Sequence, residues 1–375
     1  MKKTLVTDVV FPTKLSLWRI CETASFIKEK NADIMVFKID GFAGITYSID
    51  FEEMKDILGY EGYNILIFDP KYNNLNEYNT KVDGTKWNGK FPASYVFTKN
   101  SSFDINEYDL IYHIFLHCYR EFNRLIEYPR EKQAIHLYPG GGFSGTKSMQ
   151  HDLPRSVKLI STNPKTSSLL ESEGITDYLE CLGGTFFTKT DIYPYKKSAK
   201  HGGQLTVAFA SLGHSIEKGA SIYHEIANEF SKKYPSNSVN FIAIGNYPFA
   251  NEGVTIYQPM PMMELMEFYY RHVDILVSID TGVAFNGWPL GIEAALTGVL
   301  LATTDPNKIQ HHYDIPSRSL VIFDLLNTTY ILDLIKTMDE DRENLFRWGE
   351  ECRKYFSNMC SYKNQQEKIF SFIDI

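Results

Sequence analysis

The feature that most constrains this chain is a regular alternation of short apolar segments with segments of helical pattern. The apolar segments of the first half include TLVTDVVF, ADIMVFKI, YNILIFD, YDLIYHIF, QAIHLYP and SVKLIST, and residues 14–30 have a helical pattern between the first two. Strands that alternate with helices form parallel sheets with helices on both faces. The first half therefore predicts a doubly wound α/β domain.

The same alternation restarts in the second half. LTVAFASLG, VNFIAIGN, VTIYQP, VDILVSID, VLLATT and SLVIFD have strand length, and helical patterns cover residues 218–233 and 262–271. Between the two series, residues 186–204 are basic and contain Pro194 and a Gly-Gly pair, a composition typical of a linker. The chain is therefore predicted to form two Rossmann-like α/β domains.

The length of 375 residues agrees with two domains, because one hydrophobic core rarely serves so long a chain. We place an N-terminal Rossmann-like domain at residues 1–190 and a C-terminal Rossmann-like domain at residues 200–350. Residues 351–375 have a charged helical pattern and can pack back on the N-terminal domain. Residues 70–107 interrupt the alternation and are predicted to form an irregular excursion.

Composition argues against several other classes of protein. A net charge of -8 argues against a general electrostatic grip on nucleic acid. No apolar run approaches the length of about 18 residues that a membrane span needs, and the start MKKTLVTDVVFP lacks the apolar region of a signal peptide. The five cysteines are widely spaced and include no CxxC pair. We expect a cytoplasmic protein with no cofactor, no metal site and no nucleic-acid partner.

The segment NGWPLGIEAALTG combines a loop with a short helix. Pro289 suits the first turn of a helix and Gly298 suits its end, which predicts a helix over residues 289–297. Its unpaired amide groups, with Gly287 allowing close approach, form a candidate phosphate site. Glu293 can lean toward the same end and accept hydrogen bonds from paired sugar hydroxyls. Alternatively, Glu293 only complements the helix dipole on a partly exposed face.

In AFASLGHSIEKGASIYHEIANEF a Lys-Gly pair opens a helix, which places Lys218 near the carboxyl end of a strand, where α/β proteins bind ligands. With VNFIAIGN, VDILVSID and GWPLGIEAALTG, this order resembles the nucleotide-sugar half of the GT-B glycosyltransferases, and most closely family 4, also called glycosyl transferases group 1. The resemblance covers residues 200–305 well and the remaining chain in outline. The matching residues are Lys218, Gly219, Gly245, Glu264, Phe268, Tyr269, Asp274, Ser278, Gly287, Pro289, Glu293, Ala294 and Gly298.

The resemblance implies a GT-B fold, in which two doubly wound Rossmann-like domains face each other across a cleft. It implies that residues 1–190 form the acceptor-side domain and that residues 200–350 form the nucleotide-sugar-binding domain. It implies that Lys218 neutralises the donor diphosphate, that the loop around Gly287 approaches the sugar and phosphate, and that Glu293 holds the nucleotide ribose. The donor-binding residues that it implies are Gly213, His214, Lys218, Gly245, Asn286, Gly287, Trp288, Pro289, Leu290 and Glu293.

For the first domain, the resemblance implies a histidine at the end of a strand beside the donor sugar and the acceptor. QAIHLYPGGGFSG puts His136 at that place, and domain closure would bring His136 to the sugar. His113 and His117 in YDLIYHIFLH are rival candidates, and each of the three can instead be a hydrogen-bonded structural histidine. We expect the catalytic residues to be His136, Lys218 and Glu293.

Two positions depart from the pattern of the family. An arginine usually lies shortly before the lysine, where this chain has Gly213, His214 and Ser215, and an acid usually lies eight residues before the glutamate, where this chain has Phe285. The run GGGFSGTKS, residues 140–148, lacks the lysine directly after the last glycine that a phosphate-binding loop requires. We therefore predict no NTPase, and interpret these glycines as a loop that faces the cleft.

The sequence thus predicts a glycosyltransferase that moves a sugar from a nucleoside diphosphate sugar to an acceptor hydroxyl in glycan or glycoconjugate biosynthesis. The resemblance implies retention of configuration without a divalent ion. The acceptor can be a glycan, a lipid-linked group or a protein, and the basic and apolar residues of HCYREFNRLIEYPREK permit peripheral membrane contact. Two alternatives remain open: a non-catalytic protein that binds sugar nucleotides or glycans, and a nucleotide-sugar epimerase, which needs no acceptor.

Overall fold

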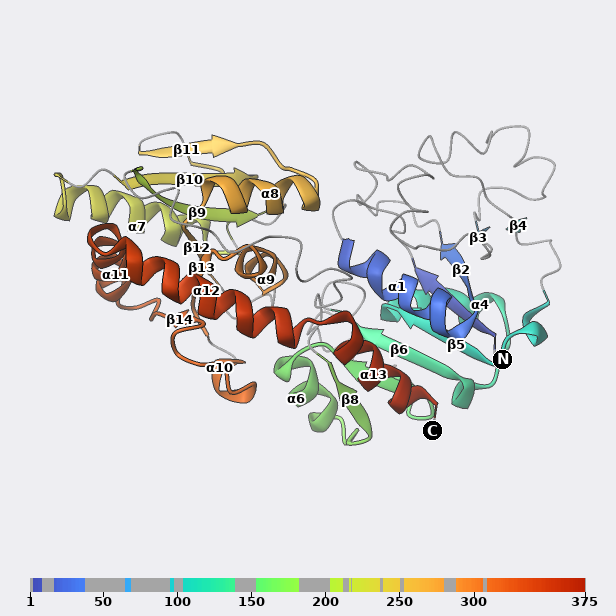
Figure 1. Ribbon diagram of the computed structural model, residues 1–375. Helices are drawn as coiled ribbons and strands as arrows, with labels where there is room; N and C mark the ends of the chain where they lie inside the picture. The colour runs from blue at the N-terminus through green and yellow to red at the C-terminus, as the bar shows by residue number, and fades with distance from the viewer. Residues whose placement is uncertain are drawn as a thin grey trace. The chain divides into compact units, whose positions relative to one another are not determined.

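The structure of the protein is a computed structural model, shown in Figure 1, and the chain divides into two compact units. Unit 1 comprises Met1–Thr188 together with Tyr362–Ile375, and unit 2 comprises Lys189–Ser361. The structure describes residues 3–8, 17–37, 65–68, 95–97, 104–138, 153–181, 203–211, 216, 218–236, 239–249, 253–279, 288–305 and 309–374.

Unit 1 is built on a sheet of eight described strands in the order β4-β3-β2-β1-β5-β6-β7-β8. Each neighbouring pair in this sheet is parallel. The strands are β1 (Thr4–Asp8), β2 (Ala32–Phe37), β3 (Ile65–Phe68), β4 (Tyr95–Phe97), β5 (Leu110–Ile114), β6 (Gln133–Leu137), β7 (Lys158–Ser161) and β8 (Tyr178–Glu180). The helices are α1 (Leu17–Lys30), α4 (Leu116–Leu125), α6 (Pro164–Ser172) and α13 (Tyr362–Ile373), with short 3-10 turns at Ile105–Glu107 and Arg130–Lys132.

Helices cover both faces of this sheet, because successive side chains of a strand point to opposite faces. On one face, α4 and α6 share an apolar cluster with Ile135 and Leu137 of β6. On the other face, Phe26 of α1 packs against Tyr112 of β5, with 4.1 Å between the ring centroids. Phe370 of α13 packs against the same Phe26, with 4.9 Å between centroids. Unit 1 is therefore a doubly wound α/β unit.

The helix α13 comes from the far end of the sequence and is tied to unit 1 by polar contacts. Lys30 Nζ lies 2.5 Å from a carboxylate oxygen of Asp374. The thiol of Cys181 donates to Oε1 of Gln365 at 2.7 Å. Lys158 Nζ donates to the carbonyl of Phe372 at 3.1 Å. These contacts hold α13 beside α1 over the sheet (Figure 1).

Unit 2 is built on a second parallel sheet, with the six described strands in the order β11-β10-β9-β12-β13-β14. The strands are β9 (Leu205–Ser211), β10 (Val239–Gly245), β11 (Val254–Tyr257), β12 (Ile275–Ser278), β13 (Leu300–Thr303) and β14 (Val321–Ile322). The helices are α7 (Ala220–Lys233), α8 (Met262–His272), α9 (Trp288–Leu296), α10 (Ile309–His312), α11 (Thr329–Glu340) and α12 (Arg342–Met359).

The two faces of the second sheet are also covered by helices. Apolar side chains of α7 and α11 form one cluster with side chains of β9, β10, β12, β13 and β14. Helices α8, α9 and α12 pack together, and α9 and α12 also contact β13. The fold class predicted from the alternation is therefore confirmed for each unit, and the predicted helix 289–297 is α9, which begins and ends one residue earlier. Among the described residues, no helix has the length and apolar character to cross a membrane.

The packing of α12 on the end of α9 depends on two glycines. Gly298 follows the end of α9 with a φ of 79°, a left-handed conformation that glycine adopts without strain. Gly349 of α12 lies against the backbone of this turn, so closely that a Cβ on Gly349 would overlap the carbonyl oxygen of Gly298. Because the obstacle is backbone, it cannot move aside as a flexible side chain does.

We expect Gly349→Ala to lower the melting temperature of the protein, because the added methyl group must displace α12 from α9 at a cost of about 1 to 3 kcal/mol. The exposed Lys354 on the same helix provides the control, since Lys354→Ala removes surface side chain only. Thermal unfolding followed by circular dichroism checks both variants. A melting temperature of Gly349→Ala equal to that of Lys354→Ala would contradict the tight contact.

Candidate functional site

The topology of unit 2 defines where a ligand would be expected. The chain passes from β9 to β10 and β11 on one side of the sheet, and then continues to β12, β13 and β14 on the other side. In open α/β sheets, ligands bind outside the carboxyl ends of the strands where the strand order reverses. The carboxyl ends of β9 and β12 therefore mark the edge of the sheet where a candidate site is expected.

The Lys218–Gly219 turn is held at this edge by close packing. Gly219 has a φ of 80° and precedes the first residue of α7. A Cβ on Gly219 would overlap the side chain of Ile279, the residue that directly follows β12. Glycine is suited to this position because it lacks a Cβ and tolerates a positive φ. The half-buried Lys218 thus belongs to a turn that is pressed against the carboxyl end of β12.

Glu293 of α9 is an enclosed carboxyl group without a polar partner among the described residues. Its exposed fraction is 3%, which contradicts the alternative of a dipole partner on a partly exposed face. No hydrogen bond or ion pair engages its carboxyl within the described part of the chain. Burial raises the pKa of Glu293 to about 8, because the charged form loses its hydration without gaining a donor. Near neutral pH the group is mostly the uncharged acid.

Tyr269 of α8 is a buried neighbour of this carboxyl group. Burial raises the pKa of the Tyr269 phenol well above its ordinary value, and the negative charge of Glu293 raises it further. Helices α8 and α9 pack directly against each other. The phenol of Tyr269 therefore lies close enough to Glu293 inside unit 2 for the charge of the carboxylate to affect its pKa, a proximity that no local sequence pattern indicated.

The raised pKa of Glu293 predicts a pH-dependent stability. A carboxyl with a pKa of about 8 when folded and 4.5 when unfolded holds its proton more tightly in the folded state. Its stabilising contribution is therefore complete below about pH 4.5 and is lost as the pH rises through about 8. We expect Glu293→Gln, which keeps the uncharged form, to match the wild-type melting temperature near pH 4 and to exceed it near pH 8.5.

Melting curves at the two pH values check this expectation, with Glu225→Gln on the exposed surface of α7 as control. The control should follow the wild type at both pH values. A Glu293→Gln variant less stable than the wild type at pH 8.5 would show that the carboxyl is not an uncompensated buried group.

A cluster of aromatic rings follows the carboxyl end of β10. The strand ends at Gly245, which has a φ of 98°. Beyond it, the ring of Phe249 stacks on His224 of α7, with 4.9 Å between centroids and an interplanar angle of 17°. Tyr247 Oη lies 3.2 Å from Nδ1 of the same histidine. The sequence analysis did not identify this cluster, although the aromatic residues of GNYPF directly after a strand were a usable signal.

Three further predicted donor-binding residues lie in the first turn of α9. Trp288 and Pro289 begin α9, and Leu290 is half-buried in its first turn. Four predicted donor-binding residues lie outside the described part of the chain: Gly213, His214, Asn286 and Gly287. Ser215 and Phe285, where the chain departs from the family pattern, also lie outside it. Within the described ranges, no group of three or more His, Cys, Asp or Glu side chains is arranged to hold a metal ion.

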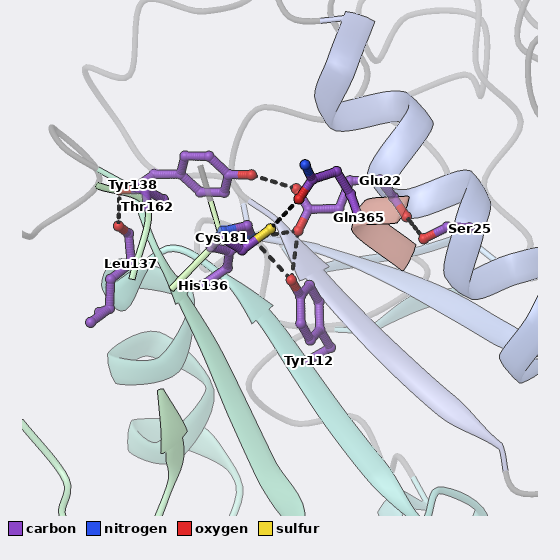
Figure 2. A network of polar contacts seen from close by, with 9 residues as sticks. All are labelled: Glu22, Ser25, Tyr112, His136, Leu137, Tyr138, Thr162, Cys181 and Gln365. Atoms are coloured by element: carbon purple, nitrogen blue, oxygen red, sulfur yellow. Dashed lines mark hydrogen bonds and ion pairs between the residues drawn. The ribbon is translucent and has the colours of Figure 1, made fainter. Parts of the chain in front are cut away.

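In unit 1, His136 of β6 and Glu22 of α1 form a buried hydrogen-bonded pair, shown in Figure 2. Nδ1 of His136 lies 2.6 Å from Oε1 of Glu22, and both side chains are fully buried. The hydroxyls of Tyr112 and Tyr138 donate to the same carboxylate at 2.6 and 2.7 Å. Burial alone would raise the pKa of Glu22, but His136 and the two hydroxyls hold it below its ordinary value.

This network determines which nitrogen of His136 is engaged. Because Glu22 is a carboxylate that accepts hydrogen bonds, the proton of the imidazole lies on Nδ1. Nε2 is buried and has no hydrogen-bond partner among the described residues. His136 therefore lies in an enclosed hydrogen-bond network, and Nε2 is its one ring nitrogen without a hydrogen-bond partner among the described residues. Glu22, Tyr112 and Tyr138 were not identified from the sequence.

The two rival histidines differ from His136. His113 is fully buried, and its nitrogens lie 2.8 Å from the hydroxyl of Thr7 and 2.9 Å from Oε1 of Gln133. Burial lowers the pKa of His113 to about 3, so the ring is neutral. His117 is half-buried, and burial and then the charge of Arg120 lower its pKa. His113 is thus the hydrogen-bonded structural histidine that was weighed as an alternative.

Comparisons with known proteins agree with this architecture. No protein-family model matches the chain, and no curated protein matches its sequence. The structure is similar to Anabaena HepE in complex with UDP, with a TM-score of 0.62, 13% identity and 100% of both chains covered. It is similar to a glycosyltransferase from Rickettsia africae, with a TM-score of 0.59, 11% identity, and 100% of this chain and 98% of that chain covered. It is also similar to a mutant of S. aureus TarM in complex with Fondaparinux, alpha-GlcNAc-glycerol and UDP, with a TM-score of 0.60, 10% identity and 100% of both chains covered.

At these identities the likeness establishes the fold. The chain has the α/β fold of the GT-B class, with two doubly wound Rossmann-like units.

Proposed function

We propose that this protein is a glycosyltransferase that moves a sugar from a nucleoside diphosphate sugar to an acceptor hydroxyl. The observation that carries this proposal is the enclosed carboxyl of Glu293, which has no partner among the described residues. Glu293 lies on α9, the helix that follows the reversal of strand order in a sheet of the GT-B class. A buried carboxyl without a partner is costly unless a ligand satisfies it. The paired hydroxyls of a ribose supply two donors of the required kind.

The main charge in this reaction develops on the departing diphosphate. In the proposed site, Lys218 and the amide groups at the amino end of α9 supply the compensating positive charge. Support comes from the Gly219–Ile279 contact, which holds the lysine turn against the strand that leads to α9. Fixed donors of this kind stabilise charge without a reorganisation step during the reaction.

The finer parts of the proposal draw support from the comparisons and from the sequence resemblance. We propose a uridine nucleotide, because HepE was solved with UDP and with UDP-glucose and TarM was solved with UDP. Membership of family 4, retention of configuration and independence of a divalent ion are proposed from the motif order around Lys218 and Glu293. The acceptor is proposed to be a glycan, a lipid-linked group or a protein, with peripheral contact to a membrane where the acceptor is lipid-linked.

His136 is proposed as the histidine of the acceptor side. Glu22 holds Nδ1, which leaves Nε2 for a hydrogen bond to substrate. This role requires that Nε2 become accessible during the reaction, since the side chain is fully buried in the free protein.

Donor binding is the first test of the proposal. We expect Lys218→Ala and Glu293→Gln each to weaken UDP binding by about tenfold or more, because each removes a hydrogen bond to a charged or buried group. Lys232→Ala and Glu225→Gln, both on the exposed surface of α7, are matched controls and should bind as the wild type does. Isothermal titration calorimetry measures the four affinities.

The same samples separate the alternatives in a turnover assay. Wild-type protein that fails to bind any nucleotide would contradict the proposal. Binding without turnover over a broad screen of donors and acceptors would make the protein a non-catalytic binder. Formation of a new sugar nucleotide from the donor alone would identify an epimerase.

The role of His136 is tested by transfer activity. We expect His136→Ala to lower the transfer rate by about 100-fold, because the variant loses a side chain that hydrogen-bonds the reacting groups. UDP binding by unit 2 should be retained. His117→Ala, on a half-buried rival, should keep near wild-type transfer. Retained transfer in His136→Ala, or loss of transfer only in His117→Ala, would reject the assignment.

A further inference from the structure

A pocket of about 850 Å³ lies in unit 1 at the edge of the sheet where β6 and β7 begin. Its wall on α4 presents Arg120 and Arg124, while Arg130 comes from the turn before β6 and Arg155 from the turn before β7. Both turns precede their strands, so this is the edge opposite to the carboxyl ends where α/β proteins bind substrates. The nine lining residues are Tyr119, Arg120, Asn123, Arg124, Arg130, Leu153, Pro154, Arg155 and Ser156.

The lining is strongly positive in a protein whose net charge is -8. Four of the nine lining residues are arginines, and none is acidic. Arg124 pairs with Glu121 of the same helix at 2.5 Å, and Arg155 donates to a backbone carbonyl, that of Glu173, at 3.4 Å. Arg130 takes part in no ion pair within the described residues. The pocket therefore carries several guanidinium groups on its wall and no carboxylate.

The field of these arginines reaches their neighbours. The charge of Arg120 adds to burial in lowering the pKa of His117. Burial raises the pKa of the Tyr119 phenol, and the charge of Arg130 opposes that rise. Both effects have the sign expected of a site that favours negative charge.

The α4 wall of the pocket is held in place from the interior. The amide group of Asn123 donates to Gln133 at 2.9 Å and accepts from Gln133 at 3.0 Å. Gln133 is buried and lies 2.9 Å from Nε2 of His113. A wall fixed by a buried network needs little ordering when a ligand binds, which favours affinity.

We propose that this pocket binds a phosphomonoester group. A phosphomonoester carries close to two negative charges and three acceptor oxygens, and the planar fork of a guanidinium matches two of those oxygens at once. Several arginines around one pocket suit this group better than a carboxylate, which carries a single charge. The volume is in the range of small-molecule sites. The phosphomonoester is carried either by a soluble molecule or by a lipid.

The test uses the full chain and two double variants with the same change in charge. Arg130→Gln/Arg155→Gln removes two exposed arginines of the pocket, and Arg271→Gln/Arg347→Gln removes two exposed arginines of unit 2 as the matched control. Glycerol 3-phosphate, titrated by calorimetry, represents the soluble source. Vesicles of phosphatidylcholine with and without phosphatidic acid, tested by cosedimentation, represent the lipid source.

We expect the pocket variant to bind the effective ligand about tenfold or more weakly than wild type, and the control variant to bind it unchanged. Binding should also weaken as salt is raised, because the exposed arginines are screened. A loss seen only with glycerol 3-phosphate, or only with phosphatidic acid vesicles, supports the site and assigns its source. Absence of binding to both ligands, or equal weakening in the two double variants, would overturn the proposal. Equal melting temperatures of the variants confirm that folding is unaffected.

Discussion

Every described strand pair within the two sheets is parallel, and this constraint places the candidate site. A parallel strand cannot be joined to its neighbour by a tight turn, so the chain must cross back over the sheet after each strand. The segments that follow the strands consequently collect at one edge of each sheet. Lys218, Gly245 and Glu293 belong to three different segments of unit 2, at or beyond the carboxyl ends of β9, β10 and β12. The topology determines at which edge of the sheet these residues lie, and their side chains determine the chemistry of that edge.

The two buried glutamates Glu22 and Glu293 illustrate what decides the state of an enclosed carboxyl. Glu22 is fully buried, yet an imidazole and two phenolic hydroxyls hold its pKa below the ordinary value. Glu293 is nearly as buried and receives no donor from the described residues, so its pKa rises to about 8. The burial is similar, and the difference lies in the hydrogen-bond donors that the fold supplies. The hydrogen bonds of the Glu22 carboxylate are made within the protein, whereas the carboxyl of Glu293 lacks the hydrogen-bond partner that a ligand would provide.

The fold of each unit and the helix that carries Glu293 could be predicted from the sequence, because strand and helix periodicities and the Pro-to-Gly pattern are local. The roles of Lys218 and Glu293 in donor binding stay a prediction. The Glu22 network could not be predicted, since Glu22 and His136 are 114 residues apart and Glu22 reads as one more polar residue of an amphipathic helix. The arginine pocket could not be predicted from the sequence for the same reason. Its charges lie on a helix and two separate turns, and each resembles ordinary surface charge until the sheet brings them together.

The placement of α13 has a consequence for how the protein is made. Unit 1 begins the chain, but Phe370 and Gln365, which contact Phe26 and Cys181, are translated after all of unit 2. A nascent chain therefore carries a sheet with one face partly uncovered while the ribosome synthesises the intervening residues. Unit 2 is continuous in sequence and can complete its folding first. Residues of unit 1 that are synthesised before unit 2 thus reach their final packing only after unit 2 has been made.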